Sequence, residues 1–363
     1  MKLNNFKINS KNKKVATTSS RQCLGISLTD KSINMVLLNA RSLNQFRLEK
    51  YVVVPLPKNI IGNGNIENHD ELVVHLQQAK QMLQSNCRNI TVAISQKQTS
   101  IQFLDRDEDT EYTEEEQIMA ELSQYDSMDD VSYDYQNVSI NENGKESLLL
   151  VNSKRDDVNI LMDAFTDAGI TPTQMDVDIL AIMNSAITWI NIRQPELTEK
   201  CIAVFNIDYG ETQAIIMRHG KLLYKQEINL GYDHLMQSLR RNYQLTDEEA
   251  WEMLYSQTKP EDYNQTVAQP FQQQFIQEIQ RVLQFYFTSA SQENEIEEIL
   301  VFGYSNNQAA NSLADSISQQ TSIPAQQINP ILLAQPGDAI QQAKLQQDSS
   351  LLTVAFGLAV RGL

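Results

Sequence analysis

The chain has 363 residues, of which 41% are hydrophobic and 21% charged, and 46 acidic against 29 basic side chains give a net charge of −17. This length predicts more than one domain, each with its own core. The acidic balance argues against nucleic acid as a partner, because phosphate binding needs clustered positive charge. Three scattered cysteines argue against a disulfide framework or a thiolate zinc site, which fits a reducing cytoplasm, and the four histidines lack metal-ligand spacing.

The first 21 residues carry six basic side chains and no acid, and Asn, Ser and Thr fill much of the rest. No apolar segment follows them, so the pattern does not predict a signal peptide. We interpret residues 1–21 as a basic disordered tail. Two roles stay open for it, a solubilising leader and a contact with anionic lipid. The longest apolar run, residues 351–360, is too short to span a bilayer.

Alternating apolar residues predict a first β block after the tail, with strands at residues 22–28, 33–38 and 45–54 and a further strand at 89–95. Apolar spacing of three and four residues predicts a helix over 70–85. Residues 105–134 then hold 13 acids and one base. An acidic run of this kind is typical of a solvated face. Around it we expect a helix at 114–124, strands at 134–140 and 147–151, and a hairpin turn at 141–146.

A second β block repeats the order of the first. Strands are expected at 201–207, 212–217, 222–228 and 299–302. The expected helices are 157–168, 178–192, 233–243, 247–256, 270–288, 308–320 and 351–361. Two similar halves, each with strands followed by helices, predict an α/β protein of two lobes. The predicted domains are the tail 1–21, a first lobe 22–95 plus 167–199, an inserted α+β subdomain 96–166, a second lobe 200–240 plus 295–363, and its helical subdomain 241–294.

Several short motifs also stand in a characteristic order. They are GISLT at 25–29, YVVVPLP at 51–57, GNI at 64–66, AGITP at 168–172, MDVD at 175–178, NLGY at 229–232, DEEA at 247–250, RVLQFYF at 281–287, QINP at 327–330 and GLAVR at 357–361. Together, over about residues 22–363, they resemble the PilM family, the actin-like cytoplasmic proteins of type IV pilus assembly. The resemblance implies a two-lobed actin-like fold (ribonuclease H-like, duplicated) with a subdomain inserted in the first lobe, as in PilM and the related cell-division protein FtsA.

The resemblance also implies a nucleotide cleft between the lobes. It places the cleft at Gly25, Ser27, Thr29, Asp30, Lys31, Ser32, Asn206, Asp208, Gly210, Gly231, Glu249 and Gly303. This chain departs from the family there, with Ser27 and Asn206 at the positions of two aspartates and Thr29, Asp208 and Tyr304 at positions of glycine.

Neutral Ser27 and Asn206 cannot act as a carboxylate metal anchor or a general base. Thr29 and Asp208 bring side chains where glycine lets the backbone approach a phosphate. At 4 Å, the charge of Asp208 would repel one phosphate charge by roughly 4 kcal/mol at an effective dielectric of 20. We therefore expect a pseudo-ATPase with no catalytic residue, no metal site and no required cofactor. The alternative is weak binding of Mg-ATP, with Asp208 holding Mg²⁺ from a shifted position and Asp30 or Lys31 contacting phosphate.

For partners, the resemblance implies a PilN-like inner-membrane protein, whose N-terminal cytoplasmic peptide would lie in a groove of the first lobe. The chain would then act as a scaffold at the cytoplasmic face of the inner membrane, attached peripherally through this partner, beside other pilus platform proteins and in support of twitching motility. The candidate groove residues, near the inserted subdomain, are Ile101, Phe103, Tyr125, Tyr133 and Tyr135. The competing interpretation of these side chains is core packing. An ATP-binding switch of the same machine, a paralogue in a related pilus or secretion system, and self-association also stay open.

Overall fold

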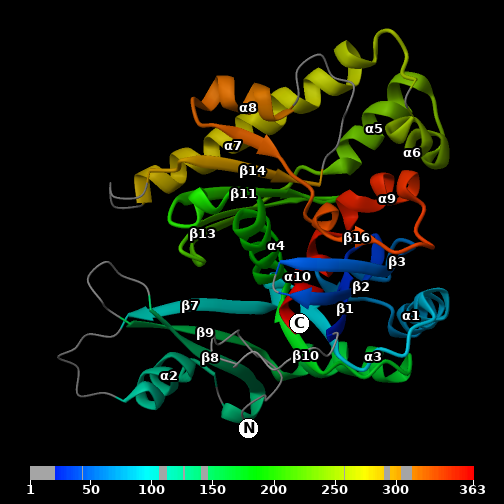
Figure 1. Cartoon of the computed structure of the whole chain (residues 1–363). Helices are drawn as coiled ribbons and strands as arrows, with labels where there is room; N and C mark the ends of the chain where they lie inside the picture. The colour runs from blue at the N-terminus through cyan, green and yellow to red at the C-terminus, as the bar shows by residue number, and fades with distance from the viewer. Residues whose placement is uncertain are drawn as a thin grey trace. The chain divides into compact units, whose positions relative to one another are not determined.

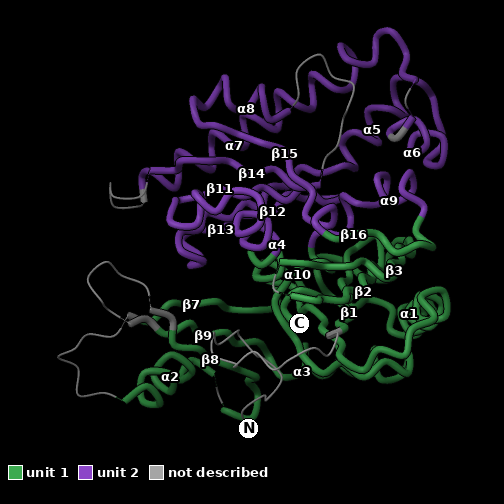
Figure 2. The backbone as a smooth tube through the Cα atoms, viewed as in Figure 1, with its two compact units in different colours: residues 1–184, 334–340, 354–363 green, residues 185–333, 341–353 purple. Residues whose placement is uncertain are grey.

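The computed structural model describes residues 21–42, 44–105, 113–125, 127–139, 146–256, 258–289, 295–303 and 313–363. It forms two compact units (Figure 2), of which unit 1 holds residues 1–184, 334–340 and 354–363 and unit 2 holds residues 185–333 and 341–353. Residues 1–20 of the predicted tail, most of the predicted turn at 141–146, and Tyr304 lie outside the described residues, and Arg21 belongs to the first strand.

Unit 1 is built on a six-stranded sheet with the order β10-β6-β1-β2-β3-β16. Its strands are β1 (Arg21–Leu28), β2 (Ser32–Ser42), β3 (Gln45–Pro55), β6 (Ile90–Ile94), β10 (Gln174–Val177) and β16 (Gln335–Pro336). Strands β1, β2 and β3 form an antiparallel meander, while β6 pairs in parallel with β1 and β10 in parallel with β6. The first predicted β block is thereby confirmed. A small ladder of β4 (Ile61–Gly62) and β5 (Asn65–Ile66) follows β3.

Two helices of unit 1 pack through apolar stripes. Helix α1 (His69–Leu83) buries Leu72, Leu76, Ala79 and Leu83, and the side chain of Asn68 accepts a hydrogen bond from the Glu71 amide at 3.2 Å to cap its first turn. Helix α3 (Arg155–Asp167) buries Val158, Leu161, Ala164 and Phe165. Helix α10 (Thr353–Gly362) passes so close to β1 that a Cβ atom on Gly25 would lie 2.0 Å from the Ala355 carbonyl oxygen.

The inserted part of unit 1 is a separate three-stranded sheet with the order β7-β9-β8 (Figure 1). Its elements are the 3₁₀ turn η1 (Gln96–Gln98), β7 (Thr99–Asp105), α2 (Glu114–Leu122), the 3₁₀ turn η2 (Met128–Asp130), β8 (Val131–Ser139) and β9 (Glu146–Lys154). Ile118 and Leu122 of α2 pack on Val131, Tyr133, Leu148 and Leu150. The helix therefore covers one face of this sheet.

Unit 2 repeats the strand arrangement of unit 1. Its sheet has the order β13-β12-β11-β14-β15, formed by β11 (Cys201–Ile207), β12 (Thr212–Arg218), β13 (Lys221–Ile228), β14 (Glu298–Phe302) and β15 (Ala325–Gln327). The first three strands are antiparallel, and β14 and β15 are added in parallel. This matches β3-β2-β1-β6-β10 strand for strand, so the predicted duplication is confirmed.

The helices are α4 (Asp178–Arg193), which runs from unit 1 into unit 2, α5 (Tyr232–Tyr243), α6 (Asp247–Tyr255), α7 (Gln269–Ser289), α8 (Leu313–Thr321) and α9 (Gln342–Asp348). A π-helical turn (Asn264–Ala268) precedes α7, and further 3₁₀ turns are Pro195–Leu197, Pro330–Leu333 and Ser349–Leu351. The core of unit 2 includes Phe205 on β11 and Phe275 on α7, whose rings meet edge to face at 6.4 Å between centroids. Helices α7 and α8 lie on the same side of the sheet (Figure 1).

Candidate functional site

In unit 1, the predicted phosphate-binding positions lie in the turn between β1 and β2. The Thr29 amide donates to the Ser32 carbonyl at 2.9 Å and closes the turn. The Thr29 hydroxyl oxygen then accepts hydrogen bonds from the amides of Lys31 at 3.2 Å and Ser32 at 3.0 Å. With glycine at position 29, no side chain would accept from those two N–H groups, and both could bind an anion. Here the turn satisfies its own donors, as hydroxyl side chains commonly do in turns.

The position at which the resemblance expects the first aspartate is deeply buried. Ser27 is 2% exposed and lies opposite Asn34, which is 1% exposed, across the hairpin. Within the part of the chain that the structure describes, Ser27 Oγ and Asn34 Oδ1 have no hydrogen-bond partner. Asp30 lies at the tip of the turn, where its carboxylate accepts from the Asn63 amide at 3.3 Å. The turn therefore holds one carboxylate, and that carboxylate binds a neighbouring loop of unit 1.

In unit 2, the corresponding turn between β11 and β12 is bonded to the start of α5. The carbonyl oxygens of Asp208 and Tyr209 accept from the amides of Tyr232 at 3.0 Å and Asp233 at 2.7 Å. The carboxylate of Asp208 accepts from the Tyr209 amide at 2.7 Å. These bonds occupy the backbone N–H groups of the first two residues of α5. Such N–H groups at a helix N-terminus are otherwise able to bind an anion.

Asn206, where the resemblance expects the second aspartate, is 4% exposed and belongs to a chain of hydrogen-bonded polar side chains. Its amide donates to Gln213 Oε1 at 2.9 Å, and Gln213 in turn donates to Glu211 Oε1 at 3.3 Å. The neutral amide thus links side chains of the neighbouring strands β11 and β12. It supplies a donor where a metal ion would need a negative oxygen.

Three of the glycines assigned to the cleft are required by close packing within their own unit. A Cβ on Gly231 would lie 2.4 Å from the Tyr209 carbonyl oxygen and 2.5 Å from that of Asp208. Gly303 has φ +93 and would place a Cβ 2.2 Å from the Ile207 carbonyl oxygen, and Gly25 is held by α10 as described above. A Cβ on Gly210, by contrast, would meet no atom of the described residues within 4 Å.

Glu249 has a structural role at the start of α6. Its carboxylate accepts from the Thr246 amide at 2.8 Å and from the Thr246 hydroxyl at 2.9 Å, while the Thr246 hydroxyl oxygen accepts from the Glu249 amide. These bonds hold the pKa of Glu249 below its ordinary value. The pair forms a capping box, whose T-x-x-E pattern is visible in the sequence.

The candidate peptide-binding residues fall on two faces of the inserted sheet. Ile101 lies opposite Val151, and Phe103 opposite Leu149, on one face. Tyr133 lies opposite Asn152 and Tyr135 opposite Leu150 on the other face, which α2 covers. Tyr125 joins that second group because its hydroxyl lies 2.6 Å from Asn152 Oδ1. The structure therefore brings Ile101 and Phe103 together, and packs the three tyrosines with α2.

Residues that the sequence did not single out complete the face of Ile101 and Phe103. Leu149 is 6% exposed and Val151 is 0% exposed, and Asp134 and Gln136 of β8 lie on the same side by register. The available signal was the unbroken apolar run LLLV at 148–151, which is typical of a strand buried on both faces. This face combines a central apolar stripe with polar groups along β8.

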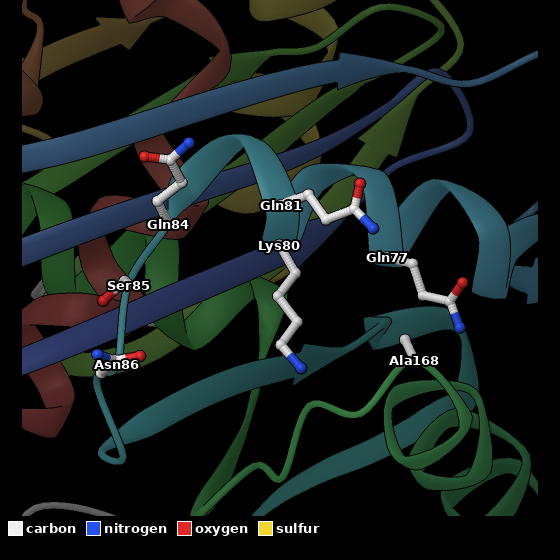
Figure 3. A pocket seen from close by; sticks show the side chains of 7 residues that line it. All are labelled: Gln77, Lys80, Gln81, Gln84, Ser85, Asn86 and Ala168. Atoms are coloured by element: carbon white, nitrogen blue, oxygen red, sulfur yellow. The ribbon is translucent and has the colours of Figure 1, made fainter.

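The surface of unit 1 also has a polar hollow of about 510 Å³ between the end of α1 and the end of α3 (Figure 3). It is lined by Gln77, Lys80, Gln81, Gln84, Ser85, Asn86 and Ala168. Lys80 donates to the Gly169 carbonyl at 2.7 Å and Gln77 to that of Asp167 at 3.3 Å. Both side chains thus fasten α1 to the end of α3, and the lining offers no acid–base pair for catalysis.

Across the described ranges, no group of three or more His, Cys, Asp or Glu side chains is placed to hold a metal ion. In the same part of the chain, no helix combines the length and apolar character that crossing a bilayer requires.

The chain is similar to known proteins over nearly its full length. The family model "Type IV pilus assembly protein PilM" matches residues 25–363. A solved PilM-PilN type IV pilus biogenesis complex is similar to this structure with a TM-score of 0.74 at 18% identity, covering 95% of this chain and 99% of that one. The ethanolamine utilization protein EutJ from Carboxydothermus hydrogenoformans gives a TM-score of 0.54 at 11% identity, covering 95% and 92%.

MreB5 of Spiroplasma citri bound to ADP gives a TM-score of 0.47 at 10% identity, over 93% of this chain and 94% of that one. The expected actin-like fold is confirmed by the duplicated sheets together with the two stronger similarities. With the family model spanning both units and the inserted sheet, the chain belongs to the PilM family of type IV pilus assembly proteins.

Proposed function

We propose that this protein is a scaffold of the type IV pilus platform that binds the N-terminal cytoplasmic peptide of a PilN-like membrane protein. Membership of the family supports a role in pilus assembly, and the similar PilM-PilN complex supports a PilN-like partner. The peptide would hold the chain at the cytoplasmic face of the inner membrane. Other platform proteins would then meet it there.

The observation that carries the proposal is the inserted sheet. Its outer strands are β7 and β8, and among the described residues no further strand pairs with either. Ile101 and Phe103 stand on β7 with intermediate exposure, beside the apolar stripe of Leu149 and Val151. An extended peptide can add to such a strand through backbone hydrogen bonds and place alternate side chains beside the half-buried Ile101 and Phe103.

The free-energy terms for peptide binding favour addition of a strand to β7. Ordering a flexible peptide costs about 1–2 kcal/mol per residue in backbone entropy. Each buried Leu or Ile anchor returns about 1.5–3 kcal/mol, and the new strand hydrogen bonds add to that. A peptide therefore needs several apolar anchors together with the strand hydrogen bonds to offset the cost of its ordering and of association.

We further infer that the chain does not hydrolyse ATP. Both carboxylate positions hold neutral, buried side chains, Ser27 and Asn206. Thr29 occupies the amides of its own turn, and Asp208 adds negative charge to the other turn. The second candidate, a switch that binds Mg-ATP weakly, is favoured by Ser27 Oγ and Asn34 Oδ1, which have no hydrogen-bond partner among the described residues.

Peptide binding is tested by fluorescence anisotropy with a labelled peptide from the N-terminus of the PilN-like protein of the same organism. Phe103→Asp is expected to weaken binding by about 10- to 150-fold, since it removes an apolar contact worth about 1.5–3 kcal/mol. Met119→Asp is the matched control, because Met119 is 45% exposed on α2 of the same subdomain. Equal affinities for the wild type and both variants would reject the β7 surface.

Nucleotide binding is tested separately by thermal denaturation. A ligand present at 100 times its Kd stabilises the folded state by about 2.7 kcal/mol, which is readily seen as a shift in Tm. We expect no shift with millimolar Mg-ATP. A clear rise in Tm would favour the switch, and ATP turnover lost on changing Ser27 or Asn206 would contradict the pseudo-ATPase assignment.

A further inference from the structure

Two segments of unit 1 carry opposite charge. Residues 1–20, which precede the first strand, hold five lysines and no acid. Residues 105–134, in the inserted subdomain, hold 13 acids and one base. Among the described residues of this subdomain, Glu115 and Glu121 of α2 are exposed. Because opposite charges attract over several ångströms of solvent, the basic segment is complementary to the inserted subdomain of its own chain.

The basic segment also contains a pattern typical of a strand. In the sequence NFKIN, residues 5–9, the apolar Phe6 and Ile8 alternate with three polar residues. Side chains two residues apart lie on the same face of a strand. As a strand, this segment would place both apolar side chains on one face and Lys7 on the other.

The outer strand β7 of the inserted sheet has a matching pattern. Among the described residues, no strand pairs with its outer side. Ile101 and Phe103 stand two residues apart on one face of β7 and are half-buried. The opposite face of the sheet is the one that α2 covers. An added strand could therefore place two apolar side chains beside Ile101 and Phe103, with its basic side chain on the acidic side of the sheet.

The basic segment is long enough to reach β7. Strand β1 runs parallel to β6, and β6 leads through the turn at 96–98 into β7. Arg21 is therefore at the end of β1 far from the inserted sheet. The seven residues from Arg21 to Leu28 cover about 23 Å at the rise of a strand. The 15 residues from Phe6 to Arg21 span up to about 50 Å when extended, which is sufficient to return along β1 and meet the start of β7.

We propose that residues 5–9 of this chain add to β7 as a strand, with their two apolar side chains beside Ile101 and Phe103. This inference rests on the proposed function, because the same surface would bind the PilN-like peptide, and the two ligands exclude each other. Linkage holds the segment at an effective concentration in the millimolar range. A segment that binds with a Kd of about 0.1 mM when separate would therefore weaken peptide binding about tenfold.

Fluorescence anisotropy of the full chain with the labelled PilN-like peptide tests this competition. The tail double variant, Phe6→Ser with Ile8→Ser, should lower the Kd of that peptide about tenfold. Asn5→Ser with Asn9→Ser is the matched control, because it changes the flanking polar residues and should leave the Kd at the wild-type value. Equal Kd values for the wild type and the tail double variant would overturn the proposal.

Direct binding of the segment locates its surface. A labelled synthetic peptide of residues 1–20 should bind the tail double variant, in which the chain's own segment no longer competes. Adding Glu115→Lys with Glu121→Lys should weaken this binding about threefold or more, since two exposed charges on α2 are reversed. Glu248→Lys with Glu252→Lys makes the same change at exposed positions of α6 and should have no effect. Equal binding by both charge variants would overturn the assigned surface.

The two proposals fail in different ways. If the PilN-like peptide binds the wild type and the tail double variant equally, the competition is refuted while peptide binding stands. If the PilN-like peptide binds neither chain, the proposed function fails, and the labelled peptide of residues 1–20 still decides whether this segment binds the inserted sheet. Cosedimentation with vesicles of phosphatidylglycerol is measured in parallel. A segment that recruits the chain to these vesicles without changing the peptide Kd binds lipid, which would overturn the proposal.

Discussion

The buried ion pair of unit 1 gives a sharp test of the structure. Arg361, near the end of α10, places its Nε 2.9 Å from Asp176 Oδ2 on β10, and the side chains are 4% and 1% exposed. Burial raises the pKa of Asp176, and the charge of Arg361 and the Val177 amide act in the opposite direction. The carboxylate therefore depends on this arginine to stay ionised inside the unit.

We predict that Arg361→Leu destabilises unit 1 strongly, because it leaves a buried carboxylate without its cation. Breaking one side of a buried pair costs about 3–5 kcal/mol. For a unit of this size, that loss corresponds to a decrease in Tm of about 6–20 °C. Differential scanning calorimetry of the full chain measures it, with the two units resolved as separate transitions if they unfold independently.

The destabilisation should depend on pH, with a sign that follows from Asp176. An acid whose pKa is raised in the folded state loses stability as pH rises from its unfolded value through its folded value. Without Arg361 the pKa of Asp176 rises further. The loss of unfolding free energy of Arg361→Leu relative to the wild type should therefore be larger at pH 8 than at pH 5. Asp176→Asn combined with Arg361→Leu removes both charges and should recover much of the Tm. A Tm for Arg361→Leu equal to that of the wild type at pH 8 would refute the reasoning.

The remaining predictions concern other buried positions. Gly231→Ala should cost about 1–3 kcal/mol through overpacking against the Asp208 and Tyr209 carbonyls, whereas Gly210→Ala should cost far less, and urea unfolding compares them. Burial lowers the pKa of Lys259 to about 8. As pH rises from 8 to 10, the urea midpoint of the wild type should therefore increase relative to that of Lys259→Met. Burial raises the pKa of Cys23 to about 12, so its thiol should resist alkylation until the chain unfolds, as mass spectrometry would show.

The duplicated meanders could be predicted because each strand carries its own pattern. Residues 22–54 and 201–228 alternate or run apolar between short turns, which is enough to locate β1–β3 and β11–β13. Strand β10 was missed because four residues, QMDV, are too few to show a period. It becomes a strand by pairing in parallel with β6. Such short strands depend on tertiary contacts that the sequence does not display.

The candidate peptide surface shows a second limit of prediction from sequence. Within β8, equal spacing predicts that Tyr133 and Tyr135 share a face, and the same holds for Ile101 and Phe103 within β7. Whether the two pairs share a face with each other depends on how both strands register with β9. A shift of one residue reverses that answer. Residue types and spacing therefore gave the right sheet region, and only the register divides its residues between the α2 face and the opposite one.

The glycines show why residue identity alone is weak support for a nucleotide site. Gly25, Gly231 and Gly303 were assigned to the cleft from the resemblance, yet each is required by a carbonyl oxygen that would lie 2.0–2.4 Å from an added Cβ. Backbone packing would select glycine at these positions whether or not a phosphate is bound. The informative positions are those where packing leaves a choice. There the chain has Ser27, Asn206 and Thr29, whose side chains remove negative charge or use turn amides. The pseudo-ATPase proposal rests on these three side chains and on the added charge of Asp208, and the glycines neither support nor oppose it.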